Sequence, residues 1–401
     1  PYETYSKDMV AQPGHTALAL EAAEKSAVLL TNNGILPLEK SAKIGVFGKL
    51  ATAENTGDFG SSRVRPPYLT TALQGLSDYL GAAISLAGDE TDPEAAGTAA
   101  AGLDAAVLVV GTTADDEGEY IPGDTGYPAL SEGVRDALED AQEAGANETA
   151  GAHVGGGDRG GDRGGDREKL RRPDDHVALI KAVTAANPNT IVVIVSGSAI
   201  ICEWAGEVAA TLQTFYSGME GGRALARLLF GDVSPSGKLP FTVALDESAY
   251  PFFDKNADEI EYGPLHGYTL MAASQTKPQF AFGHGLSYTQ FAHRALKVRR
   301  TDTGVEAEVT VINTGDRDGD EIVQLYIDYP NAAVERPAPL LRGFERVSVG
   351  AGARRTVRFS IPEQDLKYWD DGAGLWRLEP GVHKCVIGAP GGERLEAAFT
   401  V

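Results

Sequence analysis

The stretch Ala105–Val110 reads Ala-Ala-Val-Leu-Val-Val, and the acidic stretch Asp115–Tyr120 follows it closely. An unbroken apolar run of this length is typical of a strand that is covered on both faces, as in a parallel sheet. Other short apolar runs occur at 27–30, 44–47, 83–86, 191–195 and 209–215. Segments of helical composition precede or separate these runs, at 15–30, 71–80, 131–144, 175–186 and 222–229. This alternation of strands and helices predicts an α/β sheet domain over about 20–245.

The pattern changes in the last part of the chain. Val305–Val311 alternates apolar and polar residues, and similar runs at 321–327 and 354–361 are separated by turn residues. Period-two runs of this kind predict an all-β sandwich over 292–401. Residues 246–291 are rich in Pro, Gly and aromatic residues and have no clear period, so we interpret them as an ordered connector.

The overall composition excludes several classes of protein. The 401 residues include 57 acidic and 35 basic side chains, which gives a net charge of -22 and argues against nucleic acid and anionic membrane surfaces as partners. No stretch approaches the roughly 18 apolar residues of a membrane helix. Cys202 and Cys385 lie far apart, so we expect two buried thiols and no disulfide framework. The chain begins at Pro1, which suggests a cut or processed chain.

The acidic stretch is the densest candidate for chemistry. It follows a predicted buried strand, and α/β sheets place their ligands at the carboxyl ends of such strands. Four carboxylates within five residues repel one another, which should raise the pKa of at least one and suits a general acid. A solvated acidic turn is an alternative interpretation, and a metal site is a third, although no histidine lies nearby in the sequence.

Asp58–Arg63 is a second candidate because it offers Gly60 and two serines for close approach to a polar ligand. Phe59 offers an apolar ring of the kind on which sugars stack. The alternative is a helix N-cap before Thr71. For His266 and His284, in the connector, we expect structural roles, and no nucleophile elbow, phosphate loop or dinucleotide fingerprint is present.

Several motifs in this order strongly resemble the second and third domains of family 3 glycoside hydrolases. The resemblance begins at His15 and covers nearly the whole chain. The motifs that carry it are Ala-Ala-Glu-Lys-Ser-Ala-Val-Leu-Leu-Thr-Asn-Asn-Gly-Ile-Leu-Pro-Leu at 22–38, Gly-Ser-Ser at 60–62, Met-Glu-Gly-Gly at 219–222, Phe-Gly-Asp-Val-Ser-Pro-Ser-Gly-Lys-Leu-Pro at 230–240, Phe-Gly-His-Gly-Leu-Ser-Tyr at 282–288, Asn-Thr-Gly at 313–315 and Val-Gln-Leu-Tyr at 323–326.

The resemblance implies a fold: an α/β sandwich domain followed by an all-β fibronectin type III-like (immunoglobulin-like) sandwich. The family's N-terminal (β/α)8 barrel is absent from this chain, and residues 1–19 would be the linker from an upstream barrel. It also implies a retaining mechanism with two carboxylates about 5–5.5 Å apart. Glu117-Gly118 matches the family's acid/base motif, with Glu119 as the runner-up, whereas the nucleophilic Asp belongs to the barrel. At His176 the family's usual residue is Gln.

The resulting hypothesis is part of an exo-acting β-glucosidase that hydrolyses terminal non-reducing β-linked sugars, with the nucleophile supplied by a barrel on another chain or a cleaved segment. Asp58, Phe59 and Ser61 would line the outer sugar pocket. We expect no cofactor and no metal, a β-glycoside substrate, and a barrel domain or chain as partner. The alternative is a non-catalytic carbohydrate-binding or structural module. Cytoplasm, periplasm and secretion all fit the sequence.

Overall fold

A computed structural model describes residues 6–57, 64, 66–117, 167, 169–254, 257–337, 339–390 and 392–401. The chain divides into two compact units, each assembled from separate stretches of sequence. The first unit comprises Pro1–Ala23, Ser41–Gly197 and Thr214–Ala226, and the second comprises Glu24–Lys40, Ser198–Gln213 and Arg227–Val401.

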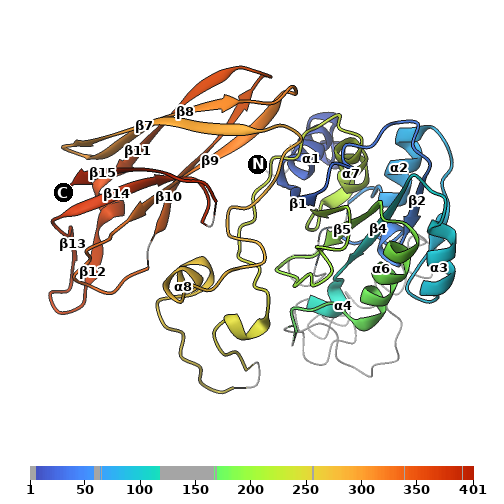
Figure 1. The fold of residues 1–401 in the computed structure, drawn as a ribbon, viewed down its shortest axis with the longest axis horizontal. Helices are drawn as coiled ribbons and strands as arrows, with labels where there is room; N and C mark the ends of the chain where they lie inside the picture. The colour runs from blue at the N-terminus through green and yellow to red at the C-terminus, as the bar shows by residue number, and fades with distance from the viewer. Residues whose placement is uncertain are drawn as a thin grey trace. The chain divides into compact units, whose positions relative to one another are not determined.

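A parallel sheet forms the centre of the first unit (Figure 1). Strand β4 pairs with β2 on one side and with β5 on the other, and β3 extends the sheet beyond β2. Every residue of β4 is buried, which is why its sequence is apolar without alternation. The strands are β2 (Ile44–Phe47), β3 (Leu86–Gly88), β4 (Ala105–Gly111) and β5 (Thr190–Val195).

Helices connect and cover these strands. Thr71 caps helix α2 by accepting a hydrogen bond from the Gln74 amide, and Asp92 caps α3 in the same way at Ala95. Helices α3 and α6 approach closely, because a Cβ on Gly97 would lie 2.9 Å from the Ala182 carbonyl oxygen. The helices are α1 (Pro13–Ser26), α2 (Ala72–Leu80), α3 (Pro93–Ala100), α4 (Ala114–Glu117), α6 (Asp174–Ala186) and α7 (Gly221–Leu229), with short 3-10 turns η2 (Lys7–Met9), η3 (Lys49–Ala51) and η4 (Gly218–Glu220).

The second unit contains an antiparallel strand pair, the predicted connector and a β-sandwich. Strand β1 (Val28–Asn32) pairs with β6 (Ala210–Gln213). The connector is ordered where the structure describes it: it carries η5 (Glu247–Ala249) and α8 (Gly267–Ala273), and Leu286 forms an isolated bridge to Leu29.

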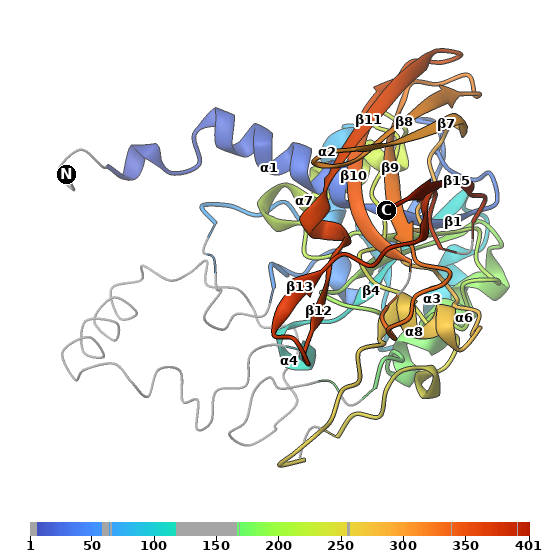
Figure 2. The ribbon, with the colours of Figure 1, turned by 90° about the vertical axis from the view of Figure 1, so that its left-hand side faces the viewer.

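The sandwich consists of a four-stranded sheet in the order β10-β9-β14-β15 and a three-stranded sheet in the order β11-β8-β7 (Figure 2). Alternate residues of β8, such as Val309 and Val311, point into an apolar core shared with Leu325 and Ile327 of β9. The elements are β7 (Phe291–Thr301), β8 (Gly304–Asn313), β9 (Gly319–Asp328), β10 (Leu340–Val349), β11 (Arg354–Pro362), η6 (Glu363–Leu366), the β12–β13 hairpin (Tyr368–Asp370 and Leu375–Arg377), β14 (Val382–Ile387) and β15 (Leu395–Thr400).

The structure confirms the predicted α/β and all-β classes and corrects some details. The helix expected over 15–30 ends at Ser26, because Val28–Asn32 pairs as a strand with β6. Helix α3 and strands β7 and β10 have no clear periodic signal and are absent from the prediction. The helix predicted at 131–144 lies outside the described residues.

The sequence also predicts two buried thiols and no membrane helix. Both cysteines are free and buried, as expected, and burial raises the pKa of the Cys385 thiol to about 12. Among the described residues, no helix is both long enough and apolar enough to cross a membrane.

Candidate functional site

The candidate site lies where β2, β3 and β4 end. These strands are parallel, so the residues that follow them meet at one edge of the sheet. Glu90, two residues after β3, accepts a hydrogen bond at 3.1 Å from the backbone amide of Lys49, two residues after β2. Thr113 and the short helix α4 follow β4. The sheet topology therefore gathers polar groups from three separate stretches of sequence.

Glycines at the strand ends allow this close assembly. Gly48 has a φ of +90°, and a Cβ there would collide with the carbonyl oxygen of Val109 in the neighbouring strand. A Cβ on Gly111 would collide with the carbonyl oxygen of Val195. The backbone turns out of β2 and β4 consequently require residues without side chains.

Asp116 holds the first turn of α4 together. Its Oδ2 accepts hydrogen bonds from the Thr113 amide at 2.8 Å and from the Thr113 hydroxyl at 3.1 Å, while its own amide donates to the Thr113 carbonyl at 3.0 Å. The other carboxylate oxygen lies 3.9 Å from Nη2 of Arg172. Asp116 is therefore engaged in local structure and is not free to act as an acid.

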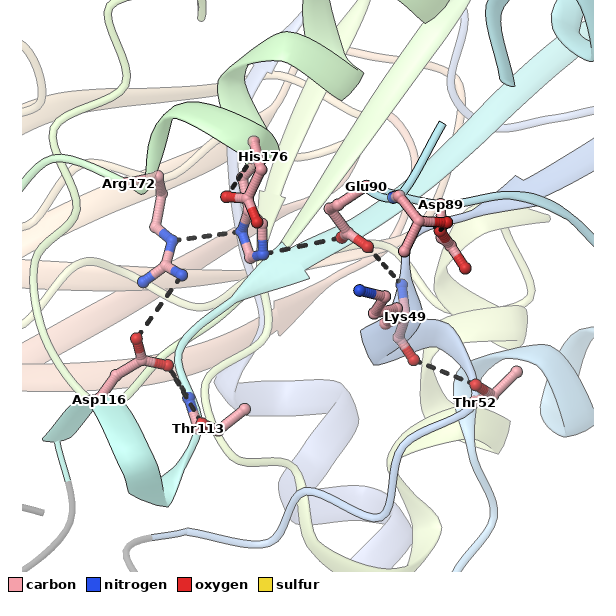
Figure 3. A network of polar contacts seen from close by, with 10 residues as sticks. Lys49, Thr52, Asp89, Glu90, Thr113, Asp116, Arg172 and His176 are labelled. Atoms are coloured by element: carbon pink, nitrogen blue, oxygen red, sulfur yellow. Dashed lines mark hydrogen bonds and ion pairs between the residues drawn. The ribbon is translucent and has the colours of Figure 1, made fainter. Parts of the chain in front are cut away.

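Arg172 and His176 connect Asp116 to Glu90 (Figure 3). The Arg172 Nε donates a hydrogen bond to Nδ1 of His176 at 3.3 Å. The other imidazole nitrogen, Nε2, lies 3.7 Å from Oε1 of Glu90. Because Nδ1 accepts, a neutral His176 carries its proton on Nε2, which faces the Glu90 carboxylate. We call Glu90, His176, Arg172, Asp116 and Thr113 the strand-end network.

Burial and charge together keep His176 neutral. Burial lowers the pKa of His176 most, and the Arg172 guanidinium lowers it further. Glu90, Asp175 and Asp116 raise it by less, so the net pKa lies below the ordinary value of 6.5. The imidazole is therefore a neutral hydrogen-bond acceptor near pH 7.

A second polar cluster surrounds Glu220, which belongs to the Met-Glu-Gly-Gly motif. Glu220 is buried, accepts a short hydrogen bond from the Tyr68 hydroxyl, and pairs with Nη1 of Arg223 at 3.0 Å. The hydrogen bond to Glu220 raises the pKa of Tyr68. Nearby, Asn55 and Thr70 line a small hollow, and the Asn55 Oδ1 has no hydrogen-bond partner among the described residues.

The residues predicted from sequence are only partly covered by the structure. Glu117 is the last residue of α4, and the structure describes its backbone but not its side chain. Glu119, Asp58, Phe59 and Ser61 lie outside the described residues. Nε2 of His284 donates a hydrogen bond to the Leu30 carbonyl at 2.8 Å, which is a structural role. Among the described residues, no group of three or more His, Cys, Asp or Glu side chains is arranged to hold a metal ion.

Four members of the strand-end network, Glu90, Thr113, Arg172 and His176, have no role in the sequence prediction. Glu90 and Arg172 are separated by 82 positions in the chain, and neither belongs to a recognisable spacing motif. His176 stands out in the sequence only as a departure from the resemblance. Only the position of Glu90 could have identified it from the sequence: Asp89-Glu90 directly follows a strand, as the acidic stretch follows β4.

These features define a protein with an α/β sheet domain, a polar network at the carboxyl ends of its parallel strands, and an immunoglobulin-like sandwich. Residues 27–288 match the glycosyl hydrolase family 3 C-terminal domain, and residues 321–390 match a fibronectin type III-like domain. The chain belongs to glycosyl hydrolase family 3.

Known relatives agree with this assignment. Thermostable beta-glucosidase B of Acetivibrio thermocellus is 30% identical over 405 residues, which cover 96% of this chain and 47% of the relative. A beta-glucosidase of Rhizobium radiobacter is 39% identical over 233 residues, covering 55% of this chain and 28% of the relative. The crystal structure of a beta-D-glucoside glucohydrolase from Trichoderma reesei superposes with a TM-score of 0.81 at 27% identity, over 97% of this chain and 56% of that one. The chain thus spans about half or less of the length of these relatives.

Proposed function

We propose that this chain supplies the general acid/base of a retaining, exo-acting β-glucosidase, and that Glu117 is that residue. The observation that carries the proposal is the position of Glu117: it ends α4, directly after the central buried strand β4 and beside the strand-end network. Membership of family 3 and relatives named beta-glucosidases support the substrate class.

In this mechanism Glu117 first donates a proton to the leaving glycosidic oxygen and later accepts one from the attacking water. The nucleophile would be an Asp of the family's (β/α)8 barrel, about 5–5.5 Å from the acid/base carboxyl, as retaining enzymes require. A carboxyl that donates a proton near neutral pH needs a raised pKa.

The test combines this chain with the barrel and measures aryl glucoside hydrolysis. Glu117→Ala should lower kcat by about 10²–10⁴-fold, the usual contribution of a general acid/base. Added azide should restore turnover of a substrate with a good leaving group, because azide attacks the glycosyl-enzyme without needing a base. Glu119→Ala is the matched control and should retain activity. Wild-type turnover by the Glu117 variant would refute the assignment, and azide rescue of the Glu119 variant alone would transfer the role to Glu119.

The sugar pocket is a second part of the proposal. Asp58, Phe59 and Ser61 line its outer wall, with Phe59 offering a ring on which a sugar stacks. Phe59→Ala should raise KM for a glucoside by about 10-fold, the effect of losing about 1.4 kcal/mol of apolar contact. An unchanged KM would remove Phe59 from the pocket.

A rival function is a non-catalytic carbohydrate-binding or structural module of the same fold. Such a module would share the fold but need no proton donor, whereas the retaining route needs two carboxylates. Intact mass of the native material distinguishes the two. Co-purification of a barrel-containing polypeptide supports the enzyme, whereas a lone 42.2 kDa species without hydrolase activity supports the module.

Domain boundaries belong to the same proposal. We place the linker at 1–19, the sheet domain that carries the acid/base loop at 20–245, the connector at 246–291 and the sandwich at 292–401. Limited proteolysis followed by mass spectrometry checks these boundaries, since cleavage concentrates where chain segments are exposed and weakly packed.

A further inference from the structure

The strand-end network contains a neutral histidine that the proposed reaction does not use. His176 belongs to the first turns of α6, and its two ring nitrogens face groups from different parts of the chain. Nδ1 faces Arg172, and Nε2 faces Glu90, which follows β3. The side chain of His176 is 14% exposed and that of Glu90 is 2% exposed, so solvent cannot easily replace these contacts.

The contact with Arg172 orients a buried guanidinium. Arg172 is a planar group with five donors, and its Nε donation to His176 fixes the plane in which the remaining nitrogens lie. One of them, Nη2, lies 3.9 Å from Oδ1 of Asp116. The Arg172 side chain is only 5% exposed, so the protein, and not water, determines its direction.

The contact with Asp116 then reaches α4. Oδ2 of Asp116 accepts from the amide and the hydroxyl of Thr113, so the carboxylate is fixed on one side by the residue just before α4 and on the other by Arg172. Glu117 is the next residue along the chain. A change in the direction of the Arg172 guanidinium would therefore move the turn that presents Glu117.

We propose that His176 is a positioning residue: as a neutral acceptor it orients Arg172, and Arg172 holds α4 in the orientation that presents the Glu117 backbone. This inference rests on the proposed role of Glu117. The proposal implies dependence on pH, because a proton on Nδ1 occupies the lone pair that accepts from Arg172. Nδ1–H then faces the Nε–H donor of Arg172, and the two donors repel each other. The charged groups that face His176 are Arg172, Glu90, Asp175 and Asp116, and they oppose one another in sign.

Hydrogen exchange of this chain tests the positioning without any catalysis. In wild type, the amides of Thr113 and Asp116 are hydrogen-bonded and should be protected at pH 7.5. His176→Leu removes the acceptor at similar size and should speed exchange of these amides by about tenfold, the equivalent of 1.4 kcal/mol. His176→Gln, whose amide oxygen can accept from Arg172, should retain most of the protection.

Lys181→Gln, an exposed change on the same helix, is the matched control and should leave the exchange unchanged. Unprotected amides in wild type, or equal protection in wild type and His176→Leu, would overturn the proposal. A long-range ¹H–¹⁵N NMR spectrum gives a second readout: above pH 7 the proton of His176 should reside on Nε2, and a proton on Nδ1 would contradict the assigned contact with Arg172.

Kinetics with the barrel present separate this proposal from the acid/base assignment. His176→Leu should lower kcat by about 10–100-fold with little change in KM, since small misplacement of a catalytic group has costs of that order. His176→Gln should restore kcat and flatten its decline at acid pH. Faster exchange at α4 with wild-type kcat would mean that the network positions α4 but that Glu117 is not the acid/base. If azide rescues Glu117→Ala while His176→Leu leaves both the exchange and kcat unchanged, Glu117 is the acid/base but His176 does not position α4.

Discussion

Two groups of charged residues, one in each unit, differ in their burial. In the sheet unit, Arg172 and Glu90 are buried and arranged around His176 at the ends of parallel strands. In the sandwich, ion pairs such as Arg299–Glu306 and Arg358–Glu308 join neighbouring strands on the exposed surface. Buried charges are costly unless every group keeps its partners, whereas exposed pairs contribute little to stability. Stability alone therefore does not explain why the sheet unit buries Arg172 and Glu90 around His176.

The largest expected effect comes from removing one member of the buried network. Arg172→Met keeps an unbranched apolar stem but removes the guanidinium, so that Asp116 and His176 lose this partner. The free energy of unfolding should fall by about 3–5 kcal/mol, as for other broken buried pairs. Urea denaturation followed by far-UV circular dichroism measures the change, with the exposed Lys181→Met on helix α6 as control. A loss below about 1 kcal/mol would place Arg172 with the exposed pairs.

In the sandwich, the comparable loss should come from the apolar core instead of from charge. Leu325 is fully buried there, and Leu325→Ala should lower the free energy of unfolding by about 2–5 kcal/mol. All three tryptophans, Trp204, Trp369 and Trp376, belong to the second unit, so tryptophan fluorescence follows its unfolding specifically. Phe344→Ala changes an apolar residue that is 68% exposed, and we expect a change within about 0.5 kcal/mol.

Acid should destabilise both units through buried histidines, and the second unit more. Burial lowers the pKa of His176 in the first unit and of His284, His293 and His383 in the second. A lowered pKa means that the unfolded chain binds the proton first, so this stability is complete above about pH 6.5 and is lost as pH falls through the folded-state values.

Urea midpoints measured between pH 7.5 and 5 check this expectation. The tryptophan-monitored transition should show the steeper decline, because three of the four histidines lie in that unit. His383→Gln should reduce the decline, whereas His176→Gln should leave the tryptophan signal unaffected. A midpoint that rises with acid would show that the sign is wrong.

The smallest effect belongs to the exposed pairs of the sandwich. Arg358 donates from Nε to Glu308 at 3.0 Å, yet its side chain is 73% exposed. Arg358→Ala should change the free energy of unfolding by only about 0.2–1 kcal/mol, and 1 M salt should remove most of that difference. If Arg358→Ala lowered the free energy of unfolding as much as Arg172→Met does, the buried and the exposed charged groups would not differ in their contribution to stability.

Much of the fold could be predicted from local pattern. The apolar stretch Ala105–Val110 forms the central strand, and the alternation in Val305–Val311 forms a sandwich strand with one face in the core. Prediction is incomplete where a pattern is weak or where a partner decides: residues 27–30 fit both a helical segment and a strand, and Val28–Asn32 is a strand because it pairs with β6. The short, alanine-rich α3 has too little amphipathic pattern to be recognised.

The candidate site divides in the same way. By itself the sequence determined the α/β and all-β classes, the family resemblance and the position of Glu117 after a buried strand, because these depend on periodicity and on motifs of contiguous residues. Tertiary structure alone decided that Glu90, Arg172 and His176 meet, since parallel strands bring their carboxyl ends together regardless of the distance between them in the chain. Burial, a property of the folded chain, also decided that His176 is neutral.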